Sequence, residues 1–103
     1  MPPPRKQKTS SLISELDVGI WYSVSCCYGN GNLNLIACSD EGYVYVSTDG
    51  GASWARQTGN GIENGTWTSV SCCYDGSNLN LIACDYDVGY VYVSTDGGAS
   101  WTP

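Results

Sequence analysis

The feature that most constrains the fold of this chain is an internal repeat, which covers most of its length. Trp21–Cys38 returns, with few changes, as Trp67–Cys84. Gly42–Trp54 returns without any change as Gly89–Trp101. Two copies of a unit of roughly 46 residues indicate a repeat architecture, in which each unit buries its apolar surface against a neighbour. Copies this similar indicate a recent duplication or a designed or reconstructed sequence, and the sequence leaves both origins open.

Each unit predicts short antiparallel strands and no helix. Val, Ile, Thr, Ser, Tyr and Gly dominate the chain, and no stretch repeats its apolar residues with the period of a helix. Gly-containing signals such as Asp-Gly between the apolar runs predict hairpin turns. In the second unit the strands are expected at Trp67–Cys73, Asn80–Cys84 and Tyr90–Ser94, with a fourth beginning at Ser100. Each unit is therefore predicted to be a four-stranded meander.

A single four-stranded sheet cannot cover both of its faces, and two stacked sheets still leave two faces open. Four-stranded units that stack around an axis are typical of β-propellers, which have about 4–8 blades. We therefore expect an all-β fold with two four-stranded antiparallel propeller blades per chain, which close into a β-propeller by homo-oligomerisation. The expected division is a disordered, basic and proline-rich tail over 1–10, a linker or a strand completing a neighbouring blade over 11–20, a first blade with its linker over 21–64, and a second blade with a truncated outer strand over 65–103.

The motif at the end of each unit resembles the Asp-box, also called the BNR repeat, of sialidase-like propellers. The matching residues are Ser47, Asp49, Gly51, Ser53 and Trp54 in the first unit, and Ser94, Asp96, Gly98, Ser100 and Trp101 in the second. A short carboxylate at a hairpin tip can accept hydrogen bonds from nearby backbone N–H groups, and glycine supplies the positive φ of the turn. The resemblance implies that the box lies between the two outer strands, away from the ligand site. We therefore expect a structural role for these residues, with each tryptophan as a buried anchor.

Two blades do not close a ring, so further blades are needed. We expect Ser11–Leu16 of one chain to complete the outer strand, or the linker, beside the last blade of the next chain. Such a head-to-tail contact closes a ring when its rotation fits. The expected partner is the chain itself, as a trimer, because the resemblance favours six blades; a tetramer or a pentamer is left open. A chain that ends at Pro103 is also compatible with a fragment of a longer propeller.

Charge is distributed unevenly between the start of the chain and the repeats. The net charge is −6, and Arg56 is the only basic residue after Lys8. An acidic surface argues against binding of nucleic acid or of an anionic membrane. No apolar run approaches the roughly 20 residues of a membrane helix, and the basic, polar start lacks the apolar core of a signal peptide. A cytoplasmic location is therefore expected.

The sequence predicts no catalytic residues, no cofactor and no metal. The chain has no histidine, which excludes a histidine base and a Ser-His triad. A sialidase-like enzyme needs an arginine cluster, whereas only Arg5 and Arg56 are present. The acids lie in Gly-rich loops, which do not provide the buried environment of a catalytic acid. We therefore expect a non-catalytic structural or binding scaffold; a fragment of an Asp-box glycosidase or assembly factor is the alternative.

The loops between the second and third strands, together with the linker between the units, form the candidate binding face. It consists of Asp40, Glu41, Glu63, Asp85, Tyr86 and Asp87. Repeated around a ring, these residues would form an acidic rim suited to weak multivalent binding of a cation, a basic partner or a glycan. A lectin-like or partner-binding module is thus a second interpretation. The simpler one is a set of solvated loops that keeps the ring soluble.

Six cysteines occupy equivalent places in the two units. They are Cys26, Cys27 and Cys38, and then Cys72, Cys73 and Cys84. Adjacent residues of a strand point to opposite faces, so Cys26 and Cys27 do not readily bond each other. We expect the six to be small buried hydrophobic residues at close contacts between blades. Disulfides and a metal site are less favoured alternatives, because no secretion signal is visible and the Cys-Cys spacing differs from that of zinc ligands.

Overall fold

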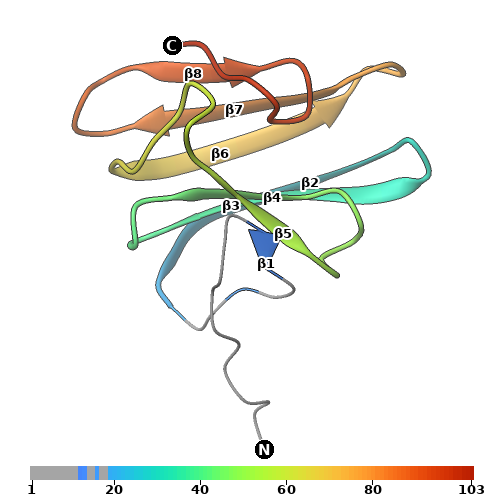
Figure 1. The fold of residues 1–103 in the computed structure, drawn as a ribbon, viewed down its shortest axis with the longest axis horizontal. Coiled ribbons are helices and arrows are strands. Elements are labelled where there is room, and N and C mark those ends of the chain that lie inside the picture. Colours follow the sequence, from blue (N-terminus) through green and yellow to red (C-terminus); the bar gives the residue numbers. More distant parts are fainter. Residues whose placement is uncertain (1–11, 14–15, 17–18) are drawn as a thin grey trace, which may run out of the picture.

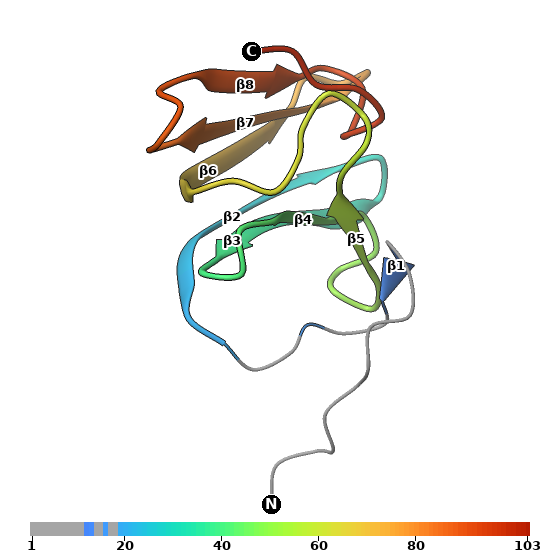
Figure 2. The same cartoon turned by 60° about the vertical axis from the view of Figure 1, so that its left-hand side comes forward.

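The described part of the chain forms two stacked antiparallel sheets and contains no helix (Figures 1 and 2). The computed structural model describes residues 12–13, 16 and 19–103. Sheet 1 has the strand order β1-β5-β4-β3-β2, and sheet 2 has the order β6-β7-β8. Within the described residues there is accordingly no helix with the length and hydropathy needed to cross a membrane. The predicted tail over 1–10 lies outside the described residues.

The strands follow the two repeats of the sequence. Sheet 1 consists of β1 (Leu12–Ile13), β2 (Trp21–Gly29), β3 (Asn32–Ser39), β4 (Val44–Ser47) and β5 (Trp54–Gln57). Sheet 2 consists of β6 (Trp67–Tyr74), β7 (Leu79–Asp85) and β8 (Val91–Ser94). The all-β fold and the four-stranded meander of the first unit are confirmed. In the second unit the fourth strand is reduced to a single bridge between Val93 and Thr102.

The segment before the first unit pairs within its own chain. Leu12 lies opposite Ala55 and Ile13 lies opposite Trp54, so β1 extends sheet 1 beyond β5. Half of the linker predicted over 11–20 lies outside the described residues. Its role beside a neighbouring chain therefore stays a prediction.

The hairpins of the two units use different turns at the same place. Between β2 and β3, Asn30 and Gly31 both have positive φ, at 53° and 78°, as a type I′ turn requires. Between β6 and β7, Gly76 has a φ of 95°, and the Asp75 carboxylate accepts the Asn78 N–H at 2.7 Å. Both turns return the chain to the same register, so the following strands of the two units correspond residue by residue.

The apolar core lies between the two sheets. Sheet 2 approaches sheet 1 through β6, which contacts β2 and β3 (Figures 1 and 2). The buried residues are Ile36, Cys38, Val44 and Val46 from sheet 1, Trp67, Val70, Leu79, Leu81 and Ala83 from sheet 2, and Ile62 and Trp101 from the segments around them. Serine and cysteine side chains on β2 are small, which permits this close approach of the strands.

Each sheet has two faces, defined by the alternation of its strands. The serine face consists of Ser23, Ser25, Cys27, Asn34, Ile36, Cys38, Val44 and Val46 in sheet 1, and of Ser69, Ser71, Cys73, Asn80, Ile82, Cys84, Val91 and Val93 in sheet 2. The tyrosine face consists of Val24, Cys26, Tyr28, Leu33, Leu35, Ala37 and Tyr45 in sheet 1, and of Val70, Cys72, Tyr74, Leu79, Leu81, Ala83 and Tyr92 in sheet 2. Both faces have the same residue types in the two sheets.

The serine face of sheet 1 packs against the tyrosine face of sheet 2. Tyr92 accordingly packs against the core, with its ring 5.2 Å from that of Trp67. Val91 and Val93 point to the opposite side of β8 and are exposed. Tyr92 and the two valines therefore lie on opposite sides of β8, as the alternation along a strand requires. The packing leaves the serine face of sheet 2 on the outside of the pair. In sheet 1 the open part of the tyrosine face consists of Val24, Cys26, Tyr28 and Leu33, whereas Ala37 and Tyr45 on the same face are buried within the chain.

Candidate functional site

The turn with the sequence STDGGASW is closed by its own side chains. In the first unit the Ser47 hydroxyl donates to Asp49 Oδ1 at 2.8 Å and accepts the Gly51 N–H at 2.9 Å. Asp49 Oδ1 accepts the Ser53 N–H at 2.9 Å, and Asp49 Oδ2 accepts the Ser53 hydroxyl at 2.5 Å. Gly50 and Gly51 have φ of 73° and 93°, a region that favours glycine.

The second unit repeats this network with the same geometry. Ser94 donates to Asp96 at 2.8 Å and accepts the Gly98 N–H at 2.9 Å. Asp96 accepts the N–H and the hydroxyl of Ser100 at 2.9 and 2.6 Å. Hydrogen bonds from the second serine of each turn, reinforced by the first, lower the pKa of Asp49 and of Asp96 to about 2. Both carboxylates are thus charged and occupied by their own turns.

This network coincides with the match to a known family. The BNR/Asp-box repeat model matches residues 45–56 and 92–103, which contain the two turns. The chain contains two Asp-box repeats. The predicted resemblance is therefore confirmed, and the repeats indicate a propeller-type β module. No curated protein and no solved structure matched the chain.

The linker between the two Asp-box units holds the second Asp-box in place. Gln57 Oε1 accepts the indole N–H of Trp101 at 3.0 Å and an amide N–H of Asn60 at 3.1 Å. The Asn60 amide also donates to the Gly98 carbonyl at 2.6 Å. Trp101 is 3% exposed, as expected of an anchor, whereas Trp54 is half-buried. Neither linker amide was predicted from the sequence, because neither belongs to a recognisable motif.

The predicted binding face forms one rim, at which the linker joins the two Asp-box units. The Gly65 N–H donates to the Gly42 carbonyl at 2.7 Å, and the Tyr86 N–H donates to the Thr66 carbonyl at 2.8 Å. These contacts place the loop after β3 and the loop after β7 next to the linker. We call the six predicted residues the acidic rim: Asp40, Glu41, Glu63, Asp85, Tyr86 and Asp87.

Three acids of the rim serve contacts within the chain. Asp85 is buried, and its Oδ1 accepts two N–H groups of the following loop at 2.9 and 3.1 Å. Glu63 accepts the Thr58 hydroxyl at 2.9 Å, and Glu41 accepts the Tyr45 hydroxyl at 3.0 Å. The exposed members of the rim include Asp40, Tyr86 and Asp87. Among the described residues, no group of three or more His, Cys, Asp or Glu could hold a metal ion.

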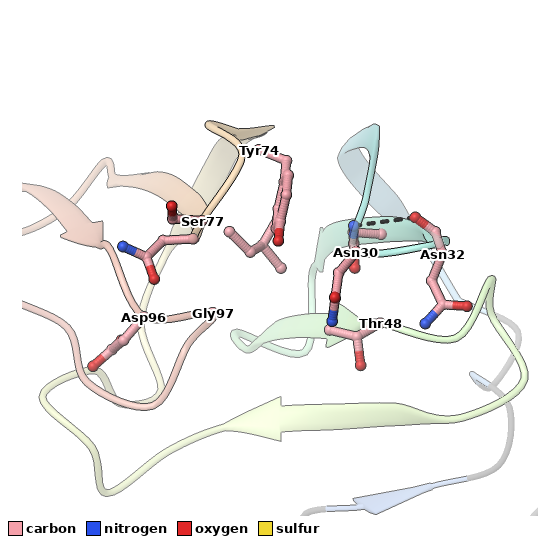
Figure 3. Close-up of a pocket in the computed structure, with 10 residues that line it drawn as sticks. Asn30, Asn32, Thr48, Tyr74, Ser77, Asp96 and Gly97 are labelled. Carbon is pink, nitrogen blue, oxygen red and sulfur yellow. Dashed lines mark hydrogen bonds between the residues drawn. The ribbon is translucent and has the colours of Figure 1, made fainter.

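A polar pocket lies between the units, where the hairpins after β2 and β6 and the two Asp-box turns meet (Figure 3). It has a volume of about 370 Å³. Its labelled lining residues are Asn30, Asn32 and Thr48 from the first unit and Tyr74, Ser77, Asp96 and Gly97 from the second. The pocket was not predicted from the sequence, because it exists only where segments far apart in the chain come together. The run of asparagines after Gly29 was its one visible signal.

The cysteines are free thiols that differ in burial. Burial raises the pKa of Cys38 to about 11 and that of Cys72 to about 12. The Cys27 thiol of the other sheet also raises the pKa of Cys72. Cys26 and Cys73 are exposed. The expectation of burial is therefore wrong for these two within the single chain, because each lies on the sheet face that no other unit covers.

Proposed function

We propose that the chain is a non-catalytic scaffold, which assembles head to tail with further copies of itself into a closed β-propeller. The observation that carries this proposal is the identity between the exposed and the buried sheet faces. Each outer face of the pair has the residues of a face that is buried inside the chain. An exposed apolar face of this kind marks an interaction site.

The serine faces of the two sheets have the same residues but differ in their exposure. In sheet 1, Ile36 and Val44 are both 0% exposed, because sheet 2 covers them. Their counterparts on sheet 2, Ile82 and Val91, are 43% and 50% exposed. The same residue types are thus covered in one unit and open in the other. The open serine face has the chemistry needed to receive a further tyrosine face.

The tyrosine faces of the two sheets also differ in exposure. In sheet 2, Val70 and Leu79 are 6% and 7% exposed, because they pack on sheet 1. Their counterparts on sheet 1, Val24 and Leu33, are 69% and 42% exposed. The serine face of one copy and the tyrosine face of the next therefore match in the way that the two sheets match within the chain. This contact is heterologous, and it generates a ring when the rotation closes.

The absence of catalysis is proposed from the use that the fold makes of its acids. Asp49 and Asp96 are charged and bound within their turns. Asp85 is buried as a cap of its own loop. A general acid or base must reach a substrate with its proton position free. These carboxylates instead stabilise loops, which suits a scaffold.

The experiment for this proposal is native mass spectrometry of the reduced full chain. A single closed species is expected at three times the 11.0 kDa chain mass, with four or five copies also compatible with a ring. A monomer, or an open series of sizes, would contradict the proposal. If further blades of a longer protein cover the two faces instead of a second copy, the monomer is what would be observed.

Two variants make the test specific for the serine face. Ile82→Asp places a charge in the open face of sheet 2, so it is expected to give a folded monomer. Val88→Asp is the control, because Val88 is 57% exposed in a loop outside both faces. This control is expected to assemble like the unchanged chain. Far-UV circular dichroism checks that both variants keep their strands.

The polar pocket favours a second candidate function, binding of a glycan. Amide groups and hydroxyls donate and accept hydrogen bonds, as the hydroxyls of a sugar do, and the Tyr74 ring provides an apolar wall. The volume of about 370 Å³ lies at the lower end of the range for small-molecule sites. The pocket would then act as the ligand site of a lectin-like ring. The acidic rim is the competing place for a glycan or a basic partner.

Titration calorimetry with a panel of methyl glycosides tests this candidate. Asn32→Ala is expected to abolish a heat signal that the unchanged chain gives, because it removes an amide from the pocket. Tyr86→Ala is the matched control on the acidic rim, and it is expected to leave the signal intact. The reverse pattern would assign the glycan to the rim, and a silent panel would exclude these sugars as ligands.

A further inference from the structure

The contact between the two sheets has a defined set of polar partners on β2 and β6. The Val70 N–H donates to the Ser23 hydroxyl at 3.2 Å, and the Cys72 thiol donates to the Ser25 hydroxyl at 3.9 Å. Cys27 and Cys72 both pack against the core between the two sheets, and the Cys27 thiol is among the groups that raise the pKa of Cys72. One cysteine of sheet 2 therefore sits beside a serine and a cysteine of sheet 1.

The open serine face of sheet 2 carries the same serine and cysteine beside an apolar hollow. A hollow of about 190 Å³ is lined by Ser71, Cys73, Ile82 and Val93 among others. A second hollow, of about 160 Å³, lies next to it and is lined by Ser69, with Ile82 again among its walls. These are the repeat equivalents of the sheet 1 positions that receive β6 within the chain.

We propose that, in the ring, Cys26 of the neighbouring copy enters the hollow beside Ser71 and contacts Cys73. We call the contact between the serine face of one copy and the tyrosine face of the next the seam. Each seam then holds a thiol pair, Cys73 with Cys26, that a disulfide reagent can link. Cys26 is the repeat equivalent of Cys72, and Cys73 is the equivalent of Cys27. Both are exposed in the single chain and free to meet a partner thiol. This inference rests on the proposed head-to-tail ring and names the residues at its seam.

The linking reaction is ordinary thiol–disulfide exchange with oxidised glutathione. The Cys73 thiolate attacks one sulfur of the reagent, and one reduced glutathione leaves. The Cys26 thiolate of the neighbouring copy then attacks the Cys73 sulfur, and the second reduced glutathione leaves. One protein disulfide forms, the glutathione disulfide is reduced, and the two thiol protons pass to the released glutathiones. The product joins two copies covalently.

The test uses the double variant Cys27→Ser with Cys72→Ser, which removes the thiol pair within the chain. This variant is treated with oxidised glutathione, alkylated, denatured and digested with trypsin. Arg56 is the only basic residue after Lys8, so trypsin separates the two units into peptides 9–56 and 57–103. A mixed disulfide-linked pair of these peptides from a covalent oligomer is expected. Adding Cys73→Ser, or Cys26→Ser, is expected to abolish it.

The possible outcomes distinguish failure of the proposed thiol pair from failure of the proposed ring. A ring in native mass spectrometry that gives no mixed link after oxidation overturns this inference and leaves the proposed function intact. A link of peptide 9–56 to itself, or of 57–103 to itself, indicates a two-fold contact and overturns both. A reduced chain that is a monomer also overturns both. Retention of the mixed link in the added Cys73→Ser variant assigns it to other cysteines and overturns the inference alone.

Discussion

Asp96 shows how a single residue fixes one turn of this fold. It accepts hydrogen bonds from Ser94 and from the N–H and the hydroxyl of Ser100. These bonds stabilise the charged carboxylate, so its pKa falls from 3.8 to about 2. A group whose pKa is lowered by folding stabilises the fold above its unfolded pKa, and this contribution is lost as the pH falls through the folded pKa.

The stability of the fold is therefore expected to decrease with pH over a defined acidic range. The melting temperature of the chain should fall between about pH 4 and pH 2, as Asp49 and Asp96 become protonated. Ser100→Ala removes the largest cause of the shift at Asp96, so the pKa of Asp96 should rise, while that of Asp49 stays at about 2. Carboxyl-carbon NMR titration measures both values in one sample. Equal shifts at both aspartates would contradict the local origin of the effect.

Gln57 is the residue that links the first unit to the anchor of the second. Its Oε1 accepts the buried indole N–H of Trp101 at 3.0 Å. Gln57→Ala leaves that donor without its acceptor, so we expect a loss of about 1–3 kcal/mol in the free energy of unfolding. Urea unfolding followed by tryptophan fluorescence measures the loss. Thr66→Ala, in the exposed part of the same linker, is the control and should change the free energy by less than about 0.5 kcal/mol.

At the scale of strands and turns, periodicity and turn chemistry were sufficient to predict most of the fold. The alternation in Tyr90–Ser94 is that of a strand with tyrosines on one side and valines on the other, but it did not predict which side faces the core. The Asp-box pattern predicted the turn network around Asp49. The pocket and the contacts of Gln57 could not be predicted, because they depend on how one unit docks on the other. The exposure of Cys26 was missed for the same reason, since a repeat pattern does not say which copy of a face is covered.

The hairpin between β2 and β3 supplies a prediction about packing between the sheets. A Cβ atom added at Gly29 would overlap the ring of Tyr74, which lies directly on the Gly29 backbone. Gly29→Ala should therefore displace this ring and lower the free energy of unfolding by about 1–3 kcal/mol. Gly19→Ala is the control, because its added Cβ would lie 4.0 Å from the nearest atom outside its neighbours in the chain. Urea unfolding at one fixed protein concentration compares the two, and equal effects would contradict the packing argument.

At the scale of the whole molecule, the two units differ where the proposed ring requires them to match. Position 29 is glycine in the first unit, and its equivalent in the second unit is Asp75. Within the chain, Tyr74 uses the space above Gly29. Between copies, the equivalent tyrosine is Tyr28, and the side chain of Asp75 stands where its ring would lie. The seam between copies is therefore expected to be looser at this rim than the contact within the chain.

Asp75→Gly should strengthen the seam, because the ring of Tyr28 of the neighbouring copy could then pack on the backbone at position 75 as Tyr74 packs on Gly29. Relief of about 1.4 kcal/mol of overpacking per seam corresponds to roughly tenfold tighter association. The substitution also removes the carboxylate that accepts the N–H groups of Ser77 and Asn78. Asp75→Ala is the matched control, because it loses the same hydrogen bonds but keeps a Cβ in the path of the ring.

Dilution followed by mass photometry or analytical ultracentrifugation gives the concentration at which each variant dissociates. Dissociation of the glycine variant at a lower concentration than the alanine variant is the expected result. Equal concentrations would mean that Tyr28 does not seat on the neighbouring hairpin, and the seam would not be a copy of the contact within the chain.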